Sequence, residues 1–192
     1  GMFGFSDRTF GANGFYSPAF PDQWESIQTK LLSMAHTHTE DNWTLQTRAY
    51  ARRNTDEFRL KRSAPEFYQN QHTTQVLALE SNGQVKNKWG ISGFGIESRE
   101  ESIRSSNLGN HRRFLLGTYV EHLLFIGSKT DLRAGIYSNY FSEFGWKHYP
   151  GLELGIQLTQ SLRLYSSLGS SLRIPTYTDW YYKGPTNIGN PD

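Results

Sequence analysis

The residues best suited to bind a metal ion are His36 and His38, with Glu40 close by. On a strand, side chains two residues apart lie on the same face, so both imidazoles could approach one ion. The pair lies beside a predicted short turn, however, where solvated polar residues are the simpler interpretation. Because the other four histidines show no ligand spacing, we predict no metal site.

A second candidate chemistry is acid–base catalysis by the carboxylates Glu97, Glu100 and Glu101, which lie close to Arg99. Charged residues at the mouth of a loop are the commoner explanation of such a group. The run Gly93-Phe94-Gly95 lacks the third glycine, the lysine and the following helix of a phosphate-binding loop. There is no nucleophile-elbow motif either. We therefore predict that the chain is not an enzyme and uses no cofactor.

The composition is polar on average but rich in aromatic residues. Hydrophobic residues make up 36% of the 192 positions, aromatic residues 15%, and the mean hydropathy is -0.64. A net charge of only +2 and the many aromatics argue against disorder. No long basic run suggests nucleic acid as a partner, and the absence of cysteine excludes thiolate and disulfide chemistry.

Transmembrane β-barrels have such a composition, because only alternate residues of their strands face lipid. Secreted β-sandwiches that bind carbohydrate share it. The clearest alternation places Leu162, Leu164 and Leu168 on one face, opposite Arg163 and Tyr165 on the other. In water the apolar face would turn inward to a core, and in a membrane it would turn outward to lipid.

The same period of two predicts an all-β chain, an antiparallel up-and-down meander of about eight long strands. The expected strands lie near residues 23–38, 42–60, 72–80, 88–99, 113–126, 130–140, 148–158 and 162–174. Many exceed the usual 5–6 residues of soluble sheets, which favours a membrane barrel, where a tilted strand needs about 9–11 residues to cross.

The predicted connections alternate between short and long, as in bacterial outer-membrane barrels. The short ones are expected at Thr39–Asp41, Ser81–Asn87, Gly127–Lys129 and Thr159–Ser161, and the long ones at Lys61–Gln71, Glu100–Arg112 and Phe141–Lys147. The short connection Ser81–Asn87 contains Asn82-Gly83, a strong hairpin dipeptide.

One motif near the carboxyl end resembles a stretch of TonB-dependent receptor barrels. It reads Arg-x-Pro-Thr, an acidic residue, aromatics and then Gly-Asn-Pro, and it is carried by Arg173, Pro175, Thr176, Asp179, Gly189, Asn190 and Pro191. Pro175 would end regular strand pairing, and the aromatics would suit an interfacial girdle. A weaker match, residues 13–17 with 21–25, resembles the cobalamin and siderophore receptors of Bacteroidota-like bacteria.

The resemblance implies that residues 1–192 are an internal part of a 22-stranded transmembrane barrel in the outer membrane of a Gram-negative bacterium. The plug domain, the TonB box and the carboxy-terminal strands would lie outside this sequence. The implied function is active uptake of a scarce nutrient, with cobalamin ahead of an iron-siderophore. The implied partners are outer-membrane lipid, the TonB complex and that small ligand.

Aromatic side chains in or near the expected outer loops are the candidates for ligand contact. They are Phe15, Tyr16, Trp146, Tyr149, Trp180 and Tyr181. Each could stack on a ligand or lie at the lipid headgroups. Two alternatives remain open, a self-contained eight-stranded outer-membrane barrel with a structural or adhesive role and a secreted carbohydrate-binding sandwich.

Overall fold

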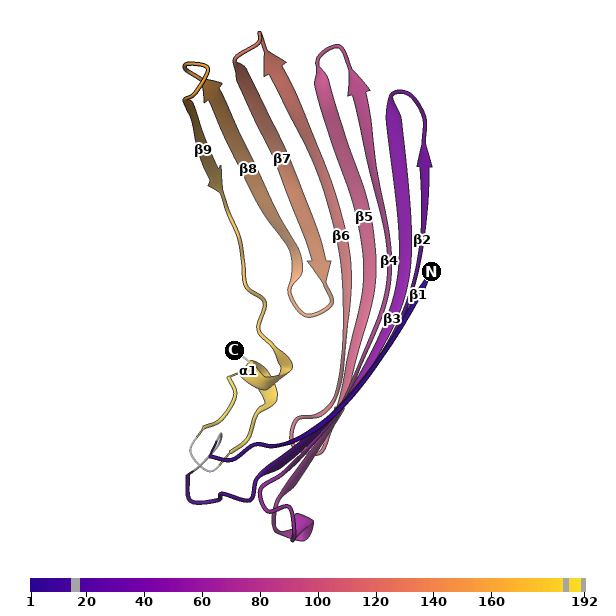
Figure 1. Ribbon diagram of the computed structural model, residues 1–192, viewed down its shortest axis with the longest axis vertical. Helices are drawn as coiled ribbons and strands as arrows, with labels where there is room; N and C mark the ends of the chain where they lie inside the picture. The colour runs from indigo at the N-terminus through magenta and orange to yellow at the C-terminus, as the bar shows by residue number, and fades with distance from the viewer. Residues whose placement is uncertain (15–17, 185–186, 191–192) are drawn as a thin grey trace.

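The computed structural model describes residues 1–14, 18–184 and 187–190, and in it the chain forms one antiparallel sheet of nine strands in sequence order (Figure 1). The strands are β1 (Met2–Gly11), β2 (Trp24–Thr39), β3 (Trp43–Arg59), β4 (Gln69–Asn87), β5 (Gly90–Ser105), β6 (Gly109–Ile126), β7 (Thr130–Phe141), β8 (Gly145–Gln157) and β9 (Arg163–Gly169). The all-β, up-and-down meander expected from the sequence is confirmed.

The strand β1 was missed in the sequence, so the count of about eight becomes nine. Its register runs from Met2 opposite Ser33 to Gly11 opposite Trp24. One of its faces mixes Gly4 and Arg8 with Phe10, and this hides the period of two. The strand is held by backbone pairing with β2, which a hydrophobic pattern does not report.

The turn predicted at Ser81–Asn87 is wrong, because these residues continue β4. Asn82 and Gly83 pair with β3 on one side and β5 on the other. A Cβ on Gly83 would lie 2.5 Å from the ring of Phe94, so this glycine makes room for a cross-strand aromatic ring instead of forming a turn. The true turn is at 88–89, followed by Gly90 with φ +148.

Two of the predicted long connections are also wrong. Residues 106–108 and 142–144 are the whole links, because β5, β6 and β8 extend into the charged or aromatic runs that had suggested loops. Those charges pair between strands, as in the ion pair of Arg112 with Glu100 at 3.5 Å. The long connections are 12–23 and 60–68, the latter holding the 3-10 helix η1 (Pro65–Phe67). All four links at the opposite end are short (Figure 1).

The two faces of the bent sheet differ sharply. The inner face, defined as the one against which the helix α1 (Tyr177–Tyr181) lies, carries a small buried core. Its members are Phe58, Ala78, Ile103, Leu115 and Phe141. The outer face exposes large apolar side chains, among them Leu32, Met34, Leu77, Leu79, Val120 and Leu168. At roughly 25 cal/mol per Å² of apolar surface, contact of these side chains with water is unfavourable.

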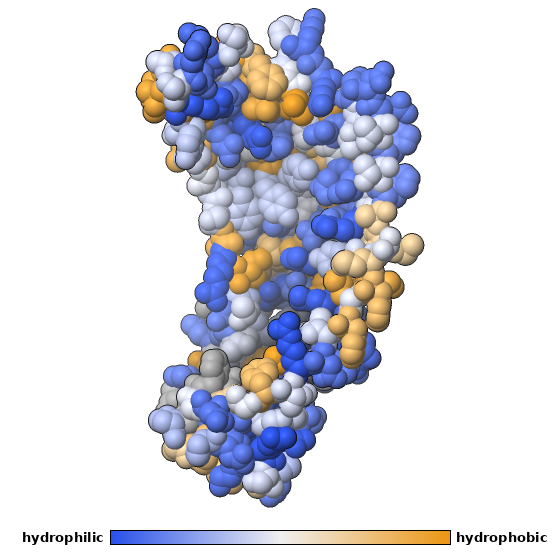
Figure 2. Space-filling view, viewed as in Figure 1, coloured by the Kyte–Doolittle hydropathy of each residue, from blue (hydrophilic) through white to orange (hydrophobic). Residues whose placement is uncertain are grey.

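The view in Figure 2 shows mainly polar side chains, with an apolar patch at the edge where β1 begins. Met2, Phe3 and Phe5 are 56–71% exposed there. Within the residues that the structure describes, no helix is both long enough and apolar enough to cross a membrane.

Candidate ligand-binding site

The C-terminal strap, defined as residues 170–190 without 185–186, leaves β9 and folds back against the inner face (Figure 1). The strand predicted over 162–174 is therefore too long, because β9 ends at Gly169. Beyond that point, within the described residues, the backbone pairs with β8 once more, where Ser170 N donates to Pro150 O at 3.2 Å. The strap then runs to Pro175, which has no N–H to offer a ladder.

Three of the motif residues, Arg173, Thr176 and Asp179, stabilise the start of α1. The Asp179 N–H donates to Thr176 Oγ1 at 3.1 Å, and the Thr176 N–H donates to Asp179 Oδ2 at 2.8 Å, which is a complete capping box. Arg173 Nη2 donates to the same carboxylate oxygen at 2.8 Å. The hydrogen bond from the Thr176 backbone, followed by smaller effects that include Arg173, lowers the pKa of Asp179 below its ordinary value.

The end of the motif returns to this helix. Gly189 N donates to Tyr182 O at 2.7 Å, and Asn190 N donates to Asp179 O at 3.0 Å. A Cβ on Gly189 would lie 2.5 Å from the carbonyl of Trp180, so only glycine permits this approach. The motif is therefore one compact turn that holds itself together, and Pro191 lies outside the described residues.

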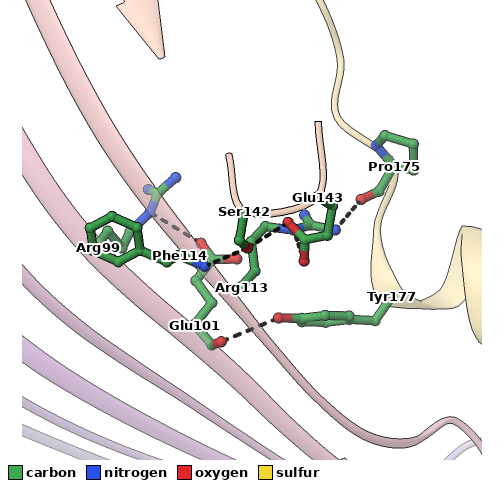
Figure 3. Close-up of polar contacts among 8 residues, drawn as sticks. All are labelled: Arg99, Glu101, Arg113, Phe114, Ser142, Glu143, Pro175 and Tyr177. Atoms are coloured by element: carbon green, nitrogen blue, oxygen red, sulfur yellow. Dashed lines mark hydrogen bonds and ion pairs between the residues drawn. The ribbon is translucent and has the colours of Figure 1, made fainter. Parts of the chain in front are cut away.

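Arg113 of β6 fastens the strap to the sheet (Figure 3). Its side chain is only 9% exposed and forms an ion pair with Glu143 at 3.4 Å. Its Nη2 donates to Pro175 O at 3.1 Å. The guanidinium also lies 5.1 Å from the ring centroid of Tyr177 and 5.2 Å from that of Trp180. This one cation contacts the strap, the turn after β7 and two aromatic rings.

The aromatic residues of α1 pack within the chain. Tyr181 stacks on His111 with ring centroids 3.5 Å apart, and Trp180 lies 4.9 Å from Phe144. The Tyr177 hydroxyl donates to the carbonyl of Glu101 at 3.3 Å, and burial raises the pKa of Tyr177 to about 12. These rings therefore form a wall on the inner face and do not form a girdle toward lipid.

A pocket of about 430 Å³ lies beside this wall, between β3, β4, β5 and the strap. Its polar lining includes Asn54, Asp56, Asn70, His72, Thr74 and Thr178, and its apolar and aromatic lining includes Phe58, Ile103, Leu108, Tyr68 and Tyr182. Asp56 and His72 are register partners on adjacent strands. Asp56 lines this pocket, and its buried Oδ1 atom has no hydrogen-bond partner among the described residues.

Such a pocket suits binding more than bond chemistry. Its volume falls within the usual range of about 300–1,000 Å³ for small-molecule sites. Carboxylate, amide and hydroxyl oxygens between aromatic walls would accept hydrogen bonds from a ligand rich in N–H or O–H donors.

The sequence-predicted ligand contacts are not brought together. Trp146 is on the outer face of β8, 50% exposed and 5.7 Å from Tyr140. Tyr149 is on the inner face of the same strand, 6.2 Å from Tyr137. Of the predicted residues that the structure describes, only Trp180 and Tyr181 belong to the strap. Phe15 and Tyr16 lie outside the described residues.

The histidine pair lies elsewhere. His36 and His38 are on the outer face, where His38 Nε2 lies 3.1 Å from Glu40 Oε1. Across residues 1–14, 18–184 and 187–190, no group of three His, Cys, Asp or Glu side chains could hold a metal ion.

Arg113, Asp56 and His72 were not singled out in the sequence. Alternation would have placed them, since Asp56 lies four residues after Arg52 and hence on the same, inner face of β3. What alternation does not reveal is that the strap would cover this end of the face.

Comparison with known proteins supports the fold alone. No protein-family model matches the sequence, and no curated protein matches it. Among solved structures, the fold is similar to the crystal structure of the siderophore receptor PirA from Pseudomonas aeruginosa, with a TM-score of 0.76 and 16% sequence identity. The similarity covers 90% of this chain and 36% of that one, so this chain spans about a third of that receptor's length.

Replacing Arg113 with Gln should release the strap. Glu143 and the Pro175 carbonyl would lose their charged donor, at a cost of about 2 kcal/mol to local stability. Hydrogen exchange at the amides of Tyr182 and Gly189 should then be markedly faster. Arg112→Gln is the matched control, because Arg112 is the neighbouring residue on the opposite face and its side chain is 72% exposed. Equal exchange in the two variants would contradict the clamp.

The cap of α1 should respond to acid. Because the pKa of Asp179 is lowered in the folded chain, its contribution to stability is complete above the unfolded-state value and is lost as pH falls through the lowered value. NMR titration of the Thr176 amide should follow this lowered pKa. In Asp179→Asn the amide should show no such titration, whereas a wild-type titration at the ordinary aspartate value would contradict the cap.

Proposed function

We propose that this chain is one arc of the wall of an outer-membrane β-barrel receptor that captures a scarce nutrient on its inner face. The observation that carries the proposal is the contrast between the two faces. The outer face exposes large apolar side chains over β1 to β9, whereas the inner face carries paired charges, the strap and a polar pocket. A barrel wall between lipid and an aqueous lumen requires this contrast.

The wall would belong to a larger barrel. In the part of the chain that the structure describes, β1 and β9 lie at opposite edges of the sheet and do not pair with each other. Unpaired edges need neighbouring strands, and the similar siderophore receptor is longer than this chain. We propose that the complete barrel has 22 strands. A plug would fill its lumen, and the TonB complex would be engaged through parts outside residues 1–192.

The two alternative architectures fit less well. A sandwich needs two packed sheets, and a closed eight-stranded barrel needs its first and last strands to pair. The described residues form a single sheet of nine strands with two open edges.

For the ligand we propose a corrinoid such as cobalamin, with an iron-siderophore as the second candidate. The pocket is lined by acceptor groups, among them the Asp56 carboxylate, and the peripheral amide groups of a corrinoid would supply N–H donors. A siderophore is favoured by the likeness of the fold to a siderophore receptor.

The orientation of the sheet can be tested with two neighbouring residues of β6. The chain has no cysteine, so Tyr119→Cys on the inner face and Val120→Cys on the outer face can each carry a single fluorophore. In vesicles with brominated acyl chains, the label at 120 should be strongly quenched and the label at 119 should not. Equal quenching at both positions would contradict a wall with one lipid face.

Ligand capture should depend on the pocket. Calorimetric titration of the folded chain with cyanocobalamin should show binding. Asp56→Asn should weaken this binding about tenfold, which is the effect of losing one charged hydrogen bond. Thr55→Ala on the opposite face is the control and should leave binding unchanged. A ferric hydroxamate titrated in parallel separates the two ligand classes. Binding of neither ligand, or equal binding by both variants, would argue against this site.

A further inference from the structure

A groove crosses the outer face of β1 to β5 where the apolar residues give way to basic ones. Its upper part, a hollow of about 400 Å³, is lined by the register partners Phe3, Leu32, Ala51 and Leu77. Two residues further along the same face, Lys30 lies opposite Arg53, and Arg53 lies opposite Gln75.

A second, smaller hollow continues the first. It measures about 170 Å³ and is lined by Arg53, Thr73, Gln75, Ser102 and Arg104. Arg53, Gln75 and Ser102 line both hollows, so the apolar and basic parts are continuous. No carboxylate lines the smaller hollow, and two guanidinium groups with hydroxyl and amide donors surround it.

The basic side chains here lack partners of their own. Lys30, Arg53 and Arg104 are exposed, and none forms an ion pair with any residue that the structure describes. The acidic neighbours on this face are already engaged. Glu100 pairs with Arg112 at 3.5 Å, and Asp7 accepts a hydrogen bond from Gln28 at 3.4 Å.

The inner face handles its cations differently. Most of its arginines pair with carboxylates, namely Arg48 with Glu80, Arg99 with Glu97 and Glu101, Arg113 with Glu143, Arg133 with Glu121 and Glu153, and Arg163 with Asp131. Among its arginines, only Arg8 and Arg52 lack an ion pair with any described residue, and Lys86 and Lys147 also lie on that face without one. The cluster of unpaired cations therefore marks the border of the apolar outer face.

We propose that this groove binds a phosphate-bearing membrane lipid, with the phosphate in the smaller hollow between Arg53 and Arg104 and an acyl chain along Leu32, Ala51 and Leu77. A phospholipid joins an anion to a long apolar chain, which matches a basic hollow continuous with an apolar one. Basic side chains just beyond an apolar band attract anionic headgroups, each by about fivefold in affinity. The proposal rests on the outer face meeting lipid.

The test compares two lipids that share a phosphate and the same acyl chains but differ in the net charge of the headgroup. The chain, folded in an uncharged detergent, is titrated with phosphatidylglycerol and with phosphatidylcholine of the same acyl chains, and bound lipid is counted by native mass spectrometry. Phosphatidylglycerol should bind at least fivefold more tightly. In Arg53→Gln/Arg104→Gln this preference should disappear, and in Arg53→Lys/Arg104→Lys most of it should remain.

The matched control is Arg8→Gln/Arg52→Gln, which removes the same charge from the inner face and should keep the full preference. An equal loss in this control, or equal affinity for the two lipids, would overturn the proposal. Inorganic phosphate that displaces phosphatidylglycerol at millimolar concentration would also overturn it, because a free-anion site would then explain the binding. Failure of the groove is distinguishable from failure of the membrane orientation, which the labels at 119 and 120 report separately.

Discussion

The backbone ladder of the antiparallel sheet is the constraint on which the rest of the structure depends. Each strand is paired without interruption along its register, from Met2 opposite Ser33 to Gly151 opposite Gly169. Since side chains alternate strictly, one register assigns every residue to the inner or the outer face, and a slip of one residue would exchange the faces. The apolar outer surface, the charged inner surface and the pocket all follow from this single register.

The strap shows how an irregular segment is held against a regular sheet. Its own capping box and the return of Gly189 and Asn190 make it a compact turn, and Arg113 attaches that turn to β6 and to Glu143. A cation that contacts the strap, the turn after β7 and two aromatic rings is costly to remove, because Glu143 and the Pro175 carbonyl would lose their charged donor. Thr178 and Tyr182 of the strap line one side of the pocket that also contains Asp56 and His72.

The two faces of the sheet differ in whether their basic residues have carboxylate partners. On the inner face most arginines lie between carboxylates, which gives a polar lining that water or a polar ligand can solvate. On the outer face Lys30, Arg53 and Arg104 stand beyond the apolar rows without an ion pair among the described residues. Charges at such a border gain most from an anionic partner outside the chain, since solvent and apolar surface meet there.

The class of fold can be predicted from the amino-acid sequence alone. A period of two predicts strands wherever it is clear, as at Leu162–Leu168, and the polar, aromatic-rich composition predicts a wall with two unlike faces. The sequence did not predict β1, the continuation of β4 through Asn82-Gly83, or the short links at 106–108 and 142–144. Pairing with neighbouring strands overrides the local turn and loop preferences there. The residues of the receptor-like motif can be recognised in the sequence, but their role in forming the compact turn of the strap cannot. That residues after Gly169 leave the ladder and cover the inner face is seen only in three dimensions, because Arg113 and His111 contact the strap from segments far away in the chain.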